Sequence, residues 1–349
     1  MTQKVAINGF GRIGRLLFRA ALERDIDLNF AVINDLAPPA SLAHLLQYDT
    51  NFGKLPWEVR VEDNVLRVKG YEIEVISQPD PEKLPWGEKD IYVVAECTGI
   101  FREREKAEKH LKAGAKKVLV SAPMRPATAA DLTIVPGVND HLYDPKKHTV
   151  ISLASCTTNC ISPVMKVLDE VFGVEAGIMT TVHAVTNDQR LLDRIHRDPR
   201  RARAAPWNIV PTTTGAAEAA ALTYEPLQGK VTGIALRVPV PTVSIVDFTA
   251  WLRTEVTKEE VNEAFREAAE KPPLKGIIAY TEEPLVSSDY VKCPYSAVID
   301  GLMTRVMPSP KGRLVKVLAW YDNEWGYSCL LYTSPSPRDR TRSRMPSSA

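Results

Sequence analysis

Residues 4–14 read KVAINGFGRIG, and this stretch predicts the fold of the first half of the chain. The apolar run at its start indicates a buried β-strand, and residues 15–23 after it indicate an α-helix. Three glycines separate the two elements: Gly9, Gly11 and Gly14. Such glycines allow a tight turn, a close approach of the backbone to a pyrophosphate, and close packing of the helix, whose N-terminus attracts negative charge. The stretch therefore predicts a dinucleotide-binding site.

A second β-strand is predicted at residues 30–34, and it ends at Asp35, about 20 residues beyond the last glycine. An acidic side chain at this position binds both ribose hydroxyls of NAD and repels the 2′-phosphate of NADP. The sequence therefore predicts NAD as the cofactor.

Further buried strands are predicted at residues 91–96 and 117–121, on either side of a helix at residues 103–113. The carboxyl ends of parallel strands meet at the same edge as the glycine loop, so Thr98 and Ser121 are candidate cofactor contacts. The alternative, that these two side chains only cap or turn the chain, stays open.

Together these features predict a Rossmann-type, doubly wound parallel sheet that forms an NAD-binding domain over residues 1–152. Residues 53–80 alternate apolar and polar residues between turn formers. This pattern indicates an antiparallel excursion before the parallel sheet resumes.

The chemistry is predicted at residues 152–160, SLASCTTNC, between a strand at residues 149–151 and an apolar helical run at residues 161–172. Cys156 therefore lies near a helix N-terminus, where unpaired amides and the helix dipole favour the thiolate over the thiol. His183 ends a β-branched run, about where a base could face that thiol. The pair suggests thiolate chemistry on a carbonyl, although a buried cysteine and a histidine are often inert.

The second half of the chain has longer strands, predicted at residues 234–246, 246–252 and 314–320, with a charged helix at residues 258–270 between them. This order predicts a second α+β domain with a mixed or antiparallel sheet, the catalytic domain, over residues 153–320.

Two features of the second half suggest an anion site. Residues 212–217, TTTGAA, precede an alanine-rich helix and can present hydroxyls and amides at its N-terminus. Arg237 is a lone charge in an apolar strand, and a buried arginine needs an anion. Together they could hold a phosphorylated substrate, although an internal ion pair would also satisfy Arg237.

A polar loop at residues 187–208 contains three neighbouring arginines: Arg200, Arg201 and Arg203. A charge cluster is often only a solvated face. A loop this long in a compact domain, however, tends to be functional or to form an interface.

Composition narrows the classes of partner. A formal net charge of +1 and a pI of about 7.6 provide no basic field, so nucleic acid is at most a secondary partner. No apolar run approaches the ~20 residues of a membrane span, and the chain opens directly with a strand, a pattern typical of a cytoplasmic protein. Five cysteines without dense spacing argue against a disulfide framework, and no second ligand pair supports a metal site.

Four motifs carry a close resemblance to a known family. They are residues 8–15 (NGFGRIGR), 155–160 (SCTTNC), 237–242 (RVPVPT) and 320–328 (WYDNEWGYS). From residue 4 to about residue 329 the chain resembles the phosphorylating glyceraldehyde-3-phosphate dehydrogenases. The resemblance implies NAD-dependent oxidative phosphorylation of D-glyceraldehyde 3-phosphate to 1,3-bisphosphoglycerate, through a hemithioacetal and a thioester on Cys156. It also implies a homotetramer whose arginine-rich loops meet near the cofactor sites.

The resemblance further implies roles for individual residues, with Cys156 as the nucleophile and His183 as its base. It implies that the substrate phosphate is bound by Thr186 and Arg237. It implies that the attacking inorganic phosphate is bound by Ser155, Thr157, Thr214 and Gly215, with Arg201 assisting. The implied cofactor contacts are Arg12, Ile13, Asp35, Ser121 and Asn323.

The chain departs from the family pattern near the cofactor. Pro79 stands where the family often places an arginine against the adenine, and Arg194 and Ile195 replace a Leu-Pro pair associated with NAD preference. Arg194 therefore leaves dual use of NAD and NADP open, against the preference that Asp35 sets.

Three other functions stay open. An erythrose-4-phosphate dehydrogenase shares the cysteine and glycine motifs, although Thr186, Thr214 and Gly215 favour the triose phosphate. A non-phosphorylating aldehyde dehydrogenase would use water in place of phosphate. The third is a non-catalytic role in binding NAD or RNA.

The resemblance stops after residue 329. Residues 321–330 are expected to return toward the cofactor domain, whereas residues 331–349 are an atypical tail rich in Ser, Arg and Pro. This tail lacks apolar periodicity, so we expect it to be disordered and the family's C-terminal helix to be missing. The cofactor domain would then keep an uncovered apolar groove.

Overall fold

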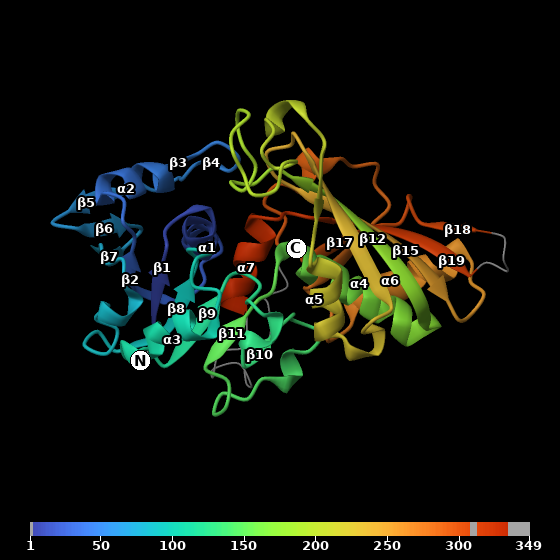
Figure 1. Ribbon diagram of the computed structural model, residues 1–349, viewed down its shortest axis with the longest axis horizontal. Helices are drawn as coiled ribbons and strands as arrows, with labels where there is room; N and C mark the ends of the chain where they lie inside the picture. The colour runs from blue at the N-terminus through green and yellow to red at the C-terminus, as the bar shows by residue number, and fades with distance from the viewer. Residues whose placement is uncertain (1–2, 308–312, 334–349) are drawn as a thin grey trace. The chain divides into compact units, whose positions relative to one another are not determined.

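The computed structural model describes residues 3–307 and 313–333 (Figure 1). The described chain forms two compact units. The N-terminal unit comprises residues 3–134, 142–154 and 328–333, and the C-terminal unit comprises residues 135–141, 155–307 and 313–327.

The N-terminal unit contains a nine-stranded sheet in the order β10-β11-β9-β8-β1-β2-β7-β6-β5. The strands are β1 (Lys4–Asn8), β2 (Asn29–Asn34), β5 (Arg60–Glu62), β6 (Val65–Val68), β7 (Tyr71–Ile76), β8 (Ile91–Glu96), β9 (Lys117–Val120), β10 (Leu132–Thr133) and β11 (Val150–Ser152). A separate pair comprises β3 (Tyr48–Asp49) and β4 (Gly53–Lys54). Strand β1 pairs in parallel with both β2 and β8, and only β5, β6 and β7 add antiparallel pairs. The predicted parallel sheet and its antiparallel excursion are both confirmed.

Three helices accompany this sheet: α1 (Arg12–Glu23), α2 (Pro39–Gln47) and α3 (Arg104–Lys112). The central strands are mostly buried, and Ala6, Ile7 and Val94 have no exposed surface. Strands covered on both faces read as continuous apolar runs, which is why this sheet could be predicted from the sequence. Helix α1 begins three residues earlier than predicted, directly after the second glycine of the loop.

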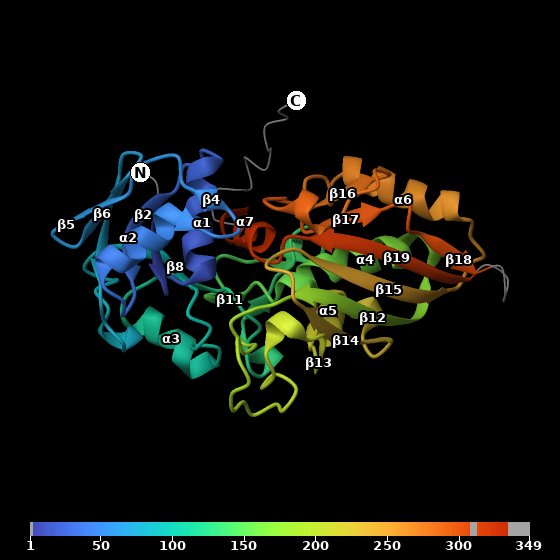
Figure 2. The ribbon, with the colours of Figure 1, turned by 90° about the horizontal axis from the view of Figure 1, so that it is seen from above.

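The C-terminal unit contains an eight-stranded mixed sheet in the order β13-β14-β12-β15-β19-β17-β16, with β18 paired to β19 (Figure 2). The strands are β12 (Val174–Ala184), β13 (Val210–Thr213), β14 (Val231–Val238), β15 (Ser244–Leu252), β16 (Ile278–Thr281), β17 (Ala297–Asp300), β18 (Arg305–Met307) and β19 (Leu314–Tyr321). Strand β12 runs parallel to β14 and antiparallel to β15. The predicted mixed sheet of the second domain is therefore confirmed.

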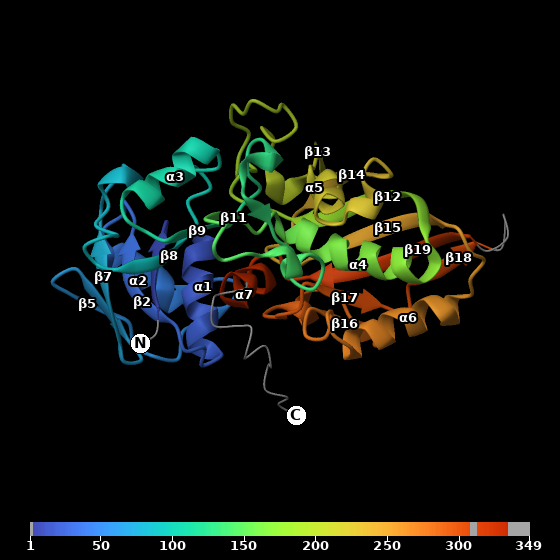
Figure 3. The same cartoon turned by 90° about the horizontal axis from the view of Figure 1, so that it is seen from below.

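Helix α4 (Cys156–Phe172) lies between α5 (Ala216–Thr223) and α6 (Lys258–Glu270) and packs on β15 and β19 (Figure 3). Residues of β15 alternate between buried and half-buried, as expected for a sheet with one face on the core. Phe248 on β15 and Ile161 on α4 are fully buried in the same apolar cluster. Burial of one such side chain contributes about 1.5–3 kcal/mol, so this layer holds the start of α4 firmly against the sheet.

Helix α4 begins at Cys156, so the predicted place of Cys156 near a helix N-terminus is confirmed. The Ser155 hydroxyl caps this helix by accepting a hydrogen bond from the Thr158 amide at 3.0 Å. One boundary in this unit differs from the prediction. The continuous strand predicted from residue 234 to residue 246 is interrupted between β14 and β15, where Pro239 and Pro241 cannot donate ladder hydrogen bonds.

The end of the described chain also corrects a prediction. Helix α7 (Trp325–Thr333) continues through the first three residues of the segment predicted to be a structureless tail. Cys329, Leu330 and Leu331 are buried, and the first proline follows only at residue 335. The rest of the predicted tail, residues 334–349, lies outside the described residues. Within the described parts of the chain, no helix is long and apolar enough to span a membrane.

Candidate functional site

The glycine loop between β1 and α1 needs its glycines for two different reasons. Gly9 has φ +89°, and a Cβ there would lie 2.8 Å from Thr98. A Cβ on Gly14 would lie 2.2 Å from the carbonyl oxygen of Gly9. Gly11, in contrast, is exposed, and a Cβ there would meet no atom within 4 Å. Gly9 and Gly14 therefore close the turn against the protein, whereas Gly11 leaves an open surface that a pyrophosphate can approach.

Asp35 lies beside this loop at the carboxyl end of β2. One carboxylate oxygen accepts the Phe10 amide at 2.7 Å and the other accepts the Ala37 amide at 2.9 Å. Because each carboxylate oxygen can accept more than one hydrogen bond, both keep capacity for ribose hydroxyls. These residues fit the dinucleotide that the sequence predicts.

Other predicted cofactor residues are more engaged with the protein. Arg12 forms an ion pair with Asp49 at 2.7 Å. Ile13, the next residue, is half-buried. The Thr98 amide and hydroxyl both donate to Glu96. The Ser121 amide donates to the Glu96 carbonyl at 3.0 Å, which ties β9 to β8. These contacts are typical of local turns and caps. They do not decide whether Thr98 and Ser121 contact the cofactor or only cap and turn the chain.

The structure brings Cys156 and His183 into contact. Cys156 is the first residue of α4, and His183 lies near the end of β12, with 3.4 Å between the cysteine Sγ and the histidine Nε2. The predicted pair is therefore a direct thiol–imidazole contact at a helix N-terminus.

Protonation in this contact differs from the expectation. Burial raises the pKa of the Cys156 thiol. The positive charge of Arg237 and hydrogen bonding by Thr157 lower this pKa, but they offset only part of the rise. Burial, together with the charge of Arg237, lowers the pKa of His183 to about 3. The dipole at the helix N-terminus does not outweigh the loss of solvent here. The resting pair is consequently a neutral thiol beside a neutral imidazole.

Arg237 lies directly behind His183, because β14 and β12 pair these two residues in register. Its Nη1 contacts the imidazole Nδ1 at 2.5 Å and the Ala184 carbonyl oxygen at 3.2 Å. Its Nε is buried without a hydrogen-bond partner, and among the described residues no carboxylate lies within salt-bridge distance of it. A half-buried guanidinium whose buried Nε has an unused donor fits an anionic ligand better than the internal ion pair that the sequence left open.

The predicted phosphate-binding residues divide into two groups. The Thr186 hydroxyl donates to the Gln189 side chain, and the Thr214 hydroxyl accepts the Ala216 amide at 3.2 Å. Gly215 is the N-cap residue of α5, and a Cβ there would meet no atom within 4 Å. These three residues therefore present small polar groups and open space.

Arg201 differs from them, because the protein already neutralises its charge. Its guanidinium pairs with Asp188 and Asp198, and its Nε donates to the Thr212 hydroxyl at 2.7 Å. An arginine held by two carboxylates has less attraction left for a phosphate. The Asp188 and Asp198 partners depend on the conformation of the loop at residues 187–208, which the sequence does not reveal.

Two buried residues near this site escaped the sequence analysis. The Ser244 hydroxyl accepts the Ala184 amide and donates to the Asn323 side chain, both at 3.0 Å. Tyr321 ends β19, and its ring lies edge-on to the His183 ring, with 6.0 Å between centroids. Tyr321 lies inside the motif at residues 320–328, close to Asn323 in the sequence. This position could have identified Tyr321 as a residue near the site.

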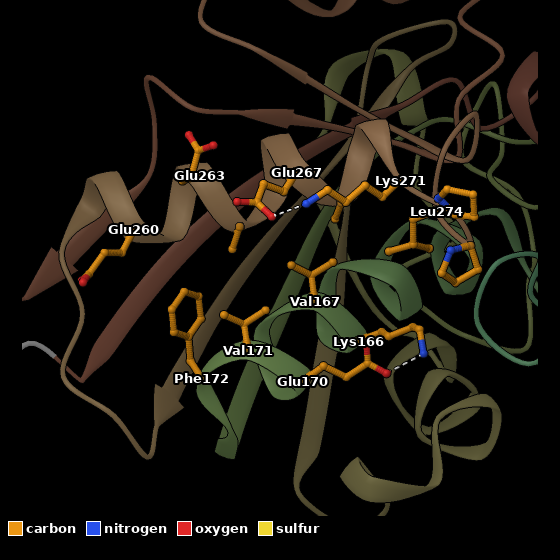
Figure 4. A pocket seen from close by; sticks show the side chains of 14 residues that line it. Lys166, Val167, Glu170, Val171, Phe172, Glu260, Glu263, Glu267, Lys271 and Leu274 are labelled. Carbon is orange, nitrogen blue, oxygen red and sulfur yellow. Dashed lines mark hydrogen bonds and ion pairs between the residues drawn. The ribbon is translucent and has the colours of Figure 1, made fainter.

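A groove of about 440 Å³ lies elsewhere in the C-terminal unit, between α4 and α6 (Figure 4). Apolar side chains such as Val167 and Phe172 line it, and two ion pairs, Lys166–Glu170 and Lys271–Glu267, lie at its edges. It contains none of the predicted site residues.

Comparison with known proteins agrees with this geometry. Residues 3–104 match the family described as glyceraldehyde 3-phosphate dehydrogenase, NAD binding domain, and residues 155–323 match the C-terminal domain of the same family. The chain is 57% identical to glyceraldehyde-3-phosphate dehydrogenase of Geobacillus stearothermophilus over 328 residues, which is 94% of this chain and 96% of the relative. It is 56% identical to glyceraldehyde-3-phosphate dehydrogenase 2 of Streptomyces avermitilis, with the same coverage. It is 54% identical to glyceraldehyde-3-phosphate dehydrogenase 2 of Bacillus subtilis over 329 residues, 94% of each chain.

Proposed function

Because the chain belongs to the glyceraldehyde-3-phosphate dehydrogenase family and is an NAD-dependent enzyme of that family, we propose that Cys156 is its nucleophile and His183 its general base. The observation that carries this proposal is the 3.4 Å contact between the cysteine Sγ and the histidine Nε2. The low pKa of His183 keeps the imidazole neutral, and a neutral imidazole can accept a proton.

The first step is attack of Cys156 on the aldehyde carbon of D-glyceraldehyde 3-phosphate. His183 takes the thiol proton as the carbon–sulfur bond forms, and it returns that proton to the carbonyl oxygen, which yields a hemithioacetal. Arg237 lies against the far side of the imidazole, so the imidazolium is short-lived beside a second cation. This placement favours rapid return of the proton.

The second step is oxidation of the hemithioacetal. NAD, when bound, would supply the hydride acceptor. His183 removes the hydroxyl proton as the hydride leaves carbon, and the product on Cys156 is a thioester. The glycine loop and Asp35 would hold the pyrophosphate and the adenosine ribose. Asn323, which accepts a hydrogen bond from the Ser244 hydroxyl, is our proposed cofactor contact within the C-terminal unit.

The last step is cleavage of the thioester by inorganic phosphate. Its oxygen forms a bond to the acyl carbon, the Cys156 thiolate leaves, and 1,3-bisphosphoglycerate results. We assign the substrate phosphate to Arg237 and Thr186, because Arg237 has an unused buried donor. Ser155, Thr157, Thr214 and Gly215 would hold the attacking phosphate, whereas Arg201 is tied to two aspartates and contributes less.

The enzyme is proposed to act as a homotetramer. The loop at residues 187–208 and the residue before β13 expose Leu191, Leu192, Ile195, Trp207 and Ile209, and Ile195 is 93% exposed. The mixed sheet also exposes Ile178 of β12 and Ile234 of β14. We infer that these exposed apolar side chains form protein–protein contacts in the assembly. The cytoplasmic location stays a prediction.

Replacement of the nucleophile tests the mechanism. Cys156→Ser should abolish NADH formation while NAD binding, measured by calorimetry, persists, because the serine hydroxyl has a far higher pKa than the thiol. Cys160→Ser, one helical turn away, is the matched control and should retain turnover. Normal turnover in the Cys156 variant would refute the assignment.

The same assay separates the alternative functions. Wild-type enzyme should require phosphate and should give a higher kcat/KM with glyceraldehyde 3-phosphate than with erythrose 4-phosphate. NADH formation that is independent of phosphate would indicate a non-phosphorylating dehydrogenase. A higher kcat/KM with erythrose 4-phosphate would indicate an erythrose-4-phosphate dehydrogenase.

A further inference from the structure

A network of buried polar side chains lies at the carboxyl edge of the parallel sheet in the N-terminal unit. It comprises Asn8 at the end of β1, Asn34 at the end of β2, Glu96 at the end of β8 and His110 on α3, each at most 5% exposed. The strand register places Asn8 between Asn34 and Glu96. The proposed function gives none of these four side chains a role.

The direction of the hydrogen bonds on the β2 side follows from a backbone donor. The Gln78 amide donates to Asn34 Oδ1 at 2.9 Å, so the side-chain nitrogen of Asn34 is the group that donates to Asn8 Oδ1 at 2.7 Å. The Asn8 Nδ2 is thereby fixed as a donor, and it lies 2.5 Å from one carboxylate oxygen of Glu96. Asn8 therefore joins β2 to Glu96 through both ends of its side chain.

His110 approaches the same oxygen of Glu96. The indole N–H of Trp86 can only donate, and it donates to His110 Nδ1 at 2.9 Å. The ring proton of His110 is therefore on Nε2, which lies 3.0 Å from the Glu96 oxygen. Asn8 Nδ2 lies 3.4 Å from this Nε2, and that contact joins two donors that share one acceptor.

The other carboxylate oxygen of Glu96 accepts from Thr98. The Thr98 amide donates to it at 2.8 Å. The Thr98 hydroxyl accepts the Ile100 amide at 3.0 Å, so its own proton goes to Glu96. These two donors, with those of Asn8 and His110, fill the roughly four acceptor sites of a carboxylate. In residues 3–307 and 313–333 no lysine or arginine pairs with Glu96, so neutral donors alone stabilise its charge.

The three strand ends of this network lead directly into the proposed cofactor site. The pairs of network residue and following site residue are Asn8 with Gly9, Asn34 with Asp35, and Glu96 with Thr98. The turn at Gly9 also lies against Thr98, since a Cβ on Gly9 would meet atoms of Thr98 at 2.8 Å. Small shifts of these strand ends would therefore misplace the groups that face the pyrophosphate and the ribose.

We infer that Glu96 is a positioning residue for the cofactor site. Its carboxylate joins the ends of β1 and β8 directly and reaches the end of β2 through Asn8, and a fully satisfied buried network holds its members in one arrangement. Glu96 is 1% exposed and acts through Asn8 and Thr98. This inference rests on the proposed binding of NAD at the glycine loop and Asp35.

Glu96→Gln tests the inference with almost no change in side-chain size. One acceptor oxygen becomes an NH₂ donor, which then faces either the donors of Asn8 and His110 or those of Thr98. The Kd for NAD, measured by calorimetry, and the KM for NAD should each rise about tenfold, because hydrogen bonds to a charged group are lost. The kcat at saturating NAD and the KM for glyceraldehyde 3-phosphate should change little, because the residues proposed for the chemical steps belong to the C-terminal unit. An unchanged Kd for NAD would overturn the inference.

Asp131→Asn is the matched control for a loss of stability alone. Asp131 is a carboxylate of the same unit that accepts the amides of Thr149 and Val150 at 2.7 and 2.8 Å and pairs with Arg104. None of these partners belongs to the network. The control should lower the thermal midpoint and leave the KM for NAD unchanged. If Glu96→Gln likewise lowers only the thermal midpoint, the inference is wrong.

An exchange of the two interacting groups distinguishes positioning from general damage. In Asn8→Asp/Glu96→Gln the carboxylate moves to position 8, where it can accept from Asn34, from the new amide at position 96 and from His110 Nε2. The amide oxygen at position 96 can still accept from Thr98. Asn8→Asp alone places two carboxylates together and should weaken NAD binding at least as much as Glu96→Gln. The double variant should recover most of the affinity, whereas additive losses would contradict the inference.

Two further variants keep the outcomes distinct. If Glu96→Gln folds poorly, Asn8→Ala removes the same links without adding a donor and should also raise the KM for NAD; an unchanged KM would overturn the inference. Asp35→Ala reports on the proposed NAD site itself. Weaker NAD binding in Asp35→Ala with normal binding in Glu96→Gln would overturn the inference and leave the site intact. Normal binding in both variants would refute the site, and the inference with it.

Discussion

Asp35 is the residue on which the choice of cofactor depends. Its carboxylate is held by the Phe10 and Ala37 amides beside the glycine loop, which places a negative charge where NADP would carry its 2′-phosphate. Asp35→Ala should lower kcat/KM for NAD and raise the relative use of NADP. The ratio of kcat/KM for NAD to kcat/KM for NADP should fall about tenfold for each 1.4 kcal/mol by which the substitution reduces the preference for NAD.

Asp35→Asn is the control that separates charge from geometry, because the amide oxygen can still accept one hydrogen bond. It should relieve the repulsion of NADP while disturbing the loop less than alanine does. Equal kcat/KM for the two cofactors in the wild-type enzyme would contradict the prediction and would point to Arg194 as a 2′-phosphate contact.

At the scale of single residues, the sequence predicted the positions of the site residues better than it predicted their protonation states. Cys156 and His183 could be paired from their places at a helix start and at the end of a strand, and the structure puts them in contact. Their protonation could not be predicted, because the burial that raises one pKa and lowers the other comes from packing against distant strands. The hydrogen bond between the hydroxyls of Tyr321 and Thr157 was missed for the same reason, since these two residues lie 164 positions apart.

Asp131 links several elements of the N-terminal unit. It accepts hydrogen bonds from the amides of Thr149 and Val150 at the start of β11 and forms an ion pair with Arg104 of α3. Burial opposes its charge, but these donors outweigh that effect and lower the pKa of Asp131 to about 2. The folded carboxylate is thus favoured relative to the unfolded chain, where its pKa is near its ordinary value of 3.8.

The consequence is a pH-dependent contribution to stability. It is fully present above pH 3.8 and is lost as the pH falls toward 2, because the folded state must then take up a proton at a cost. Asp131→Asn should lower the thermal midpoint at pH 6, and the gap to wild type should narrow between pH 4 and pH 2.5. A gap that is constant with pH would show that the carboxylate charge has no part in linking α3 to β11.

At the scale of elements, local sequence patterns predicted the interiors of helices better than their ends. Helix α6 has the predicted bounds because Thr257 and Glu260 form a capping box that is visible in the sequence. The first turn of α4 carries no apolar period, because Thr157, Thr158 and Asn159 are polar, yet all three are buried and hydrogen-bonded in the folded unit. Helix α7 extended into the predicted tail because Leu330 and Leu331 find buried positions that no local pattern announced.

For the whole molecule, the exposed apolar loop predicts assembly. Ile195→Lys should weaken or abolish the tetramer, because a charge would replace an apolar side chain that is 93% exposed in the single chain. Val171→Lys, on the exposed side of α4 and away from the loop, is the control and should leave the assembly intact. Sedimentation velocity measures both, and a wild-type chain that sediments as a monomer would refute the proposed assembly.

The open surface at Gly11 and the closed one at Gly14 carry an evolutionary consequence. A side chain at Gly14 would collide with the backbone of its own turn, so selection for folding alone is enough to retain that glycine. A methyl group at Gly11 would meet no atom of the described residues within 4 Å, so only selection for the ligand retains this glycine. A descendant that abandoned the cofactor would therefore lose Gly11 to drift while Gly14 persisted, and the surviving glycine would record an ancestral fold after its ancestral chemistry had disappeared.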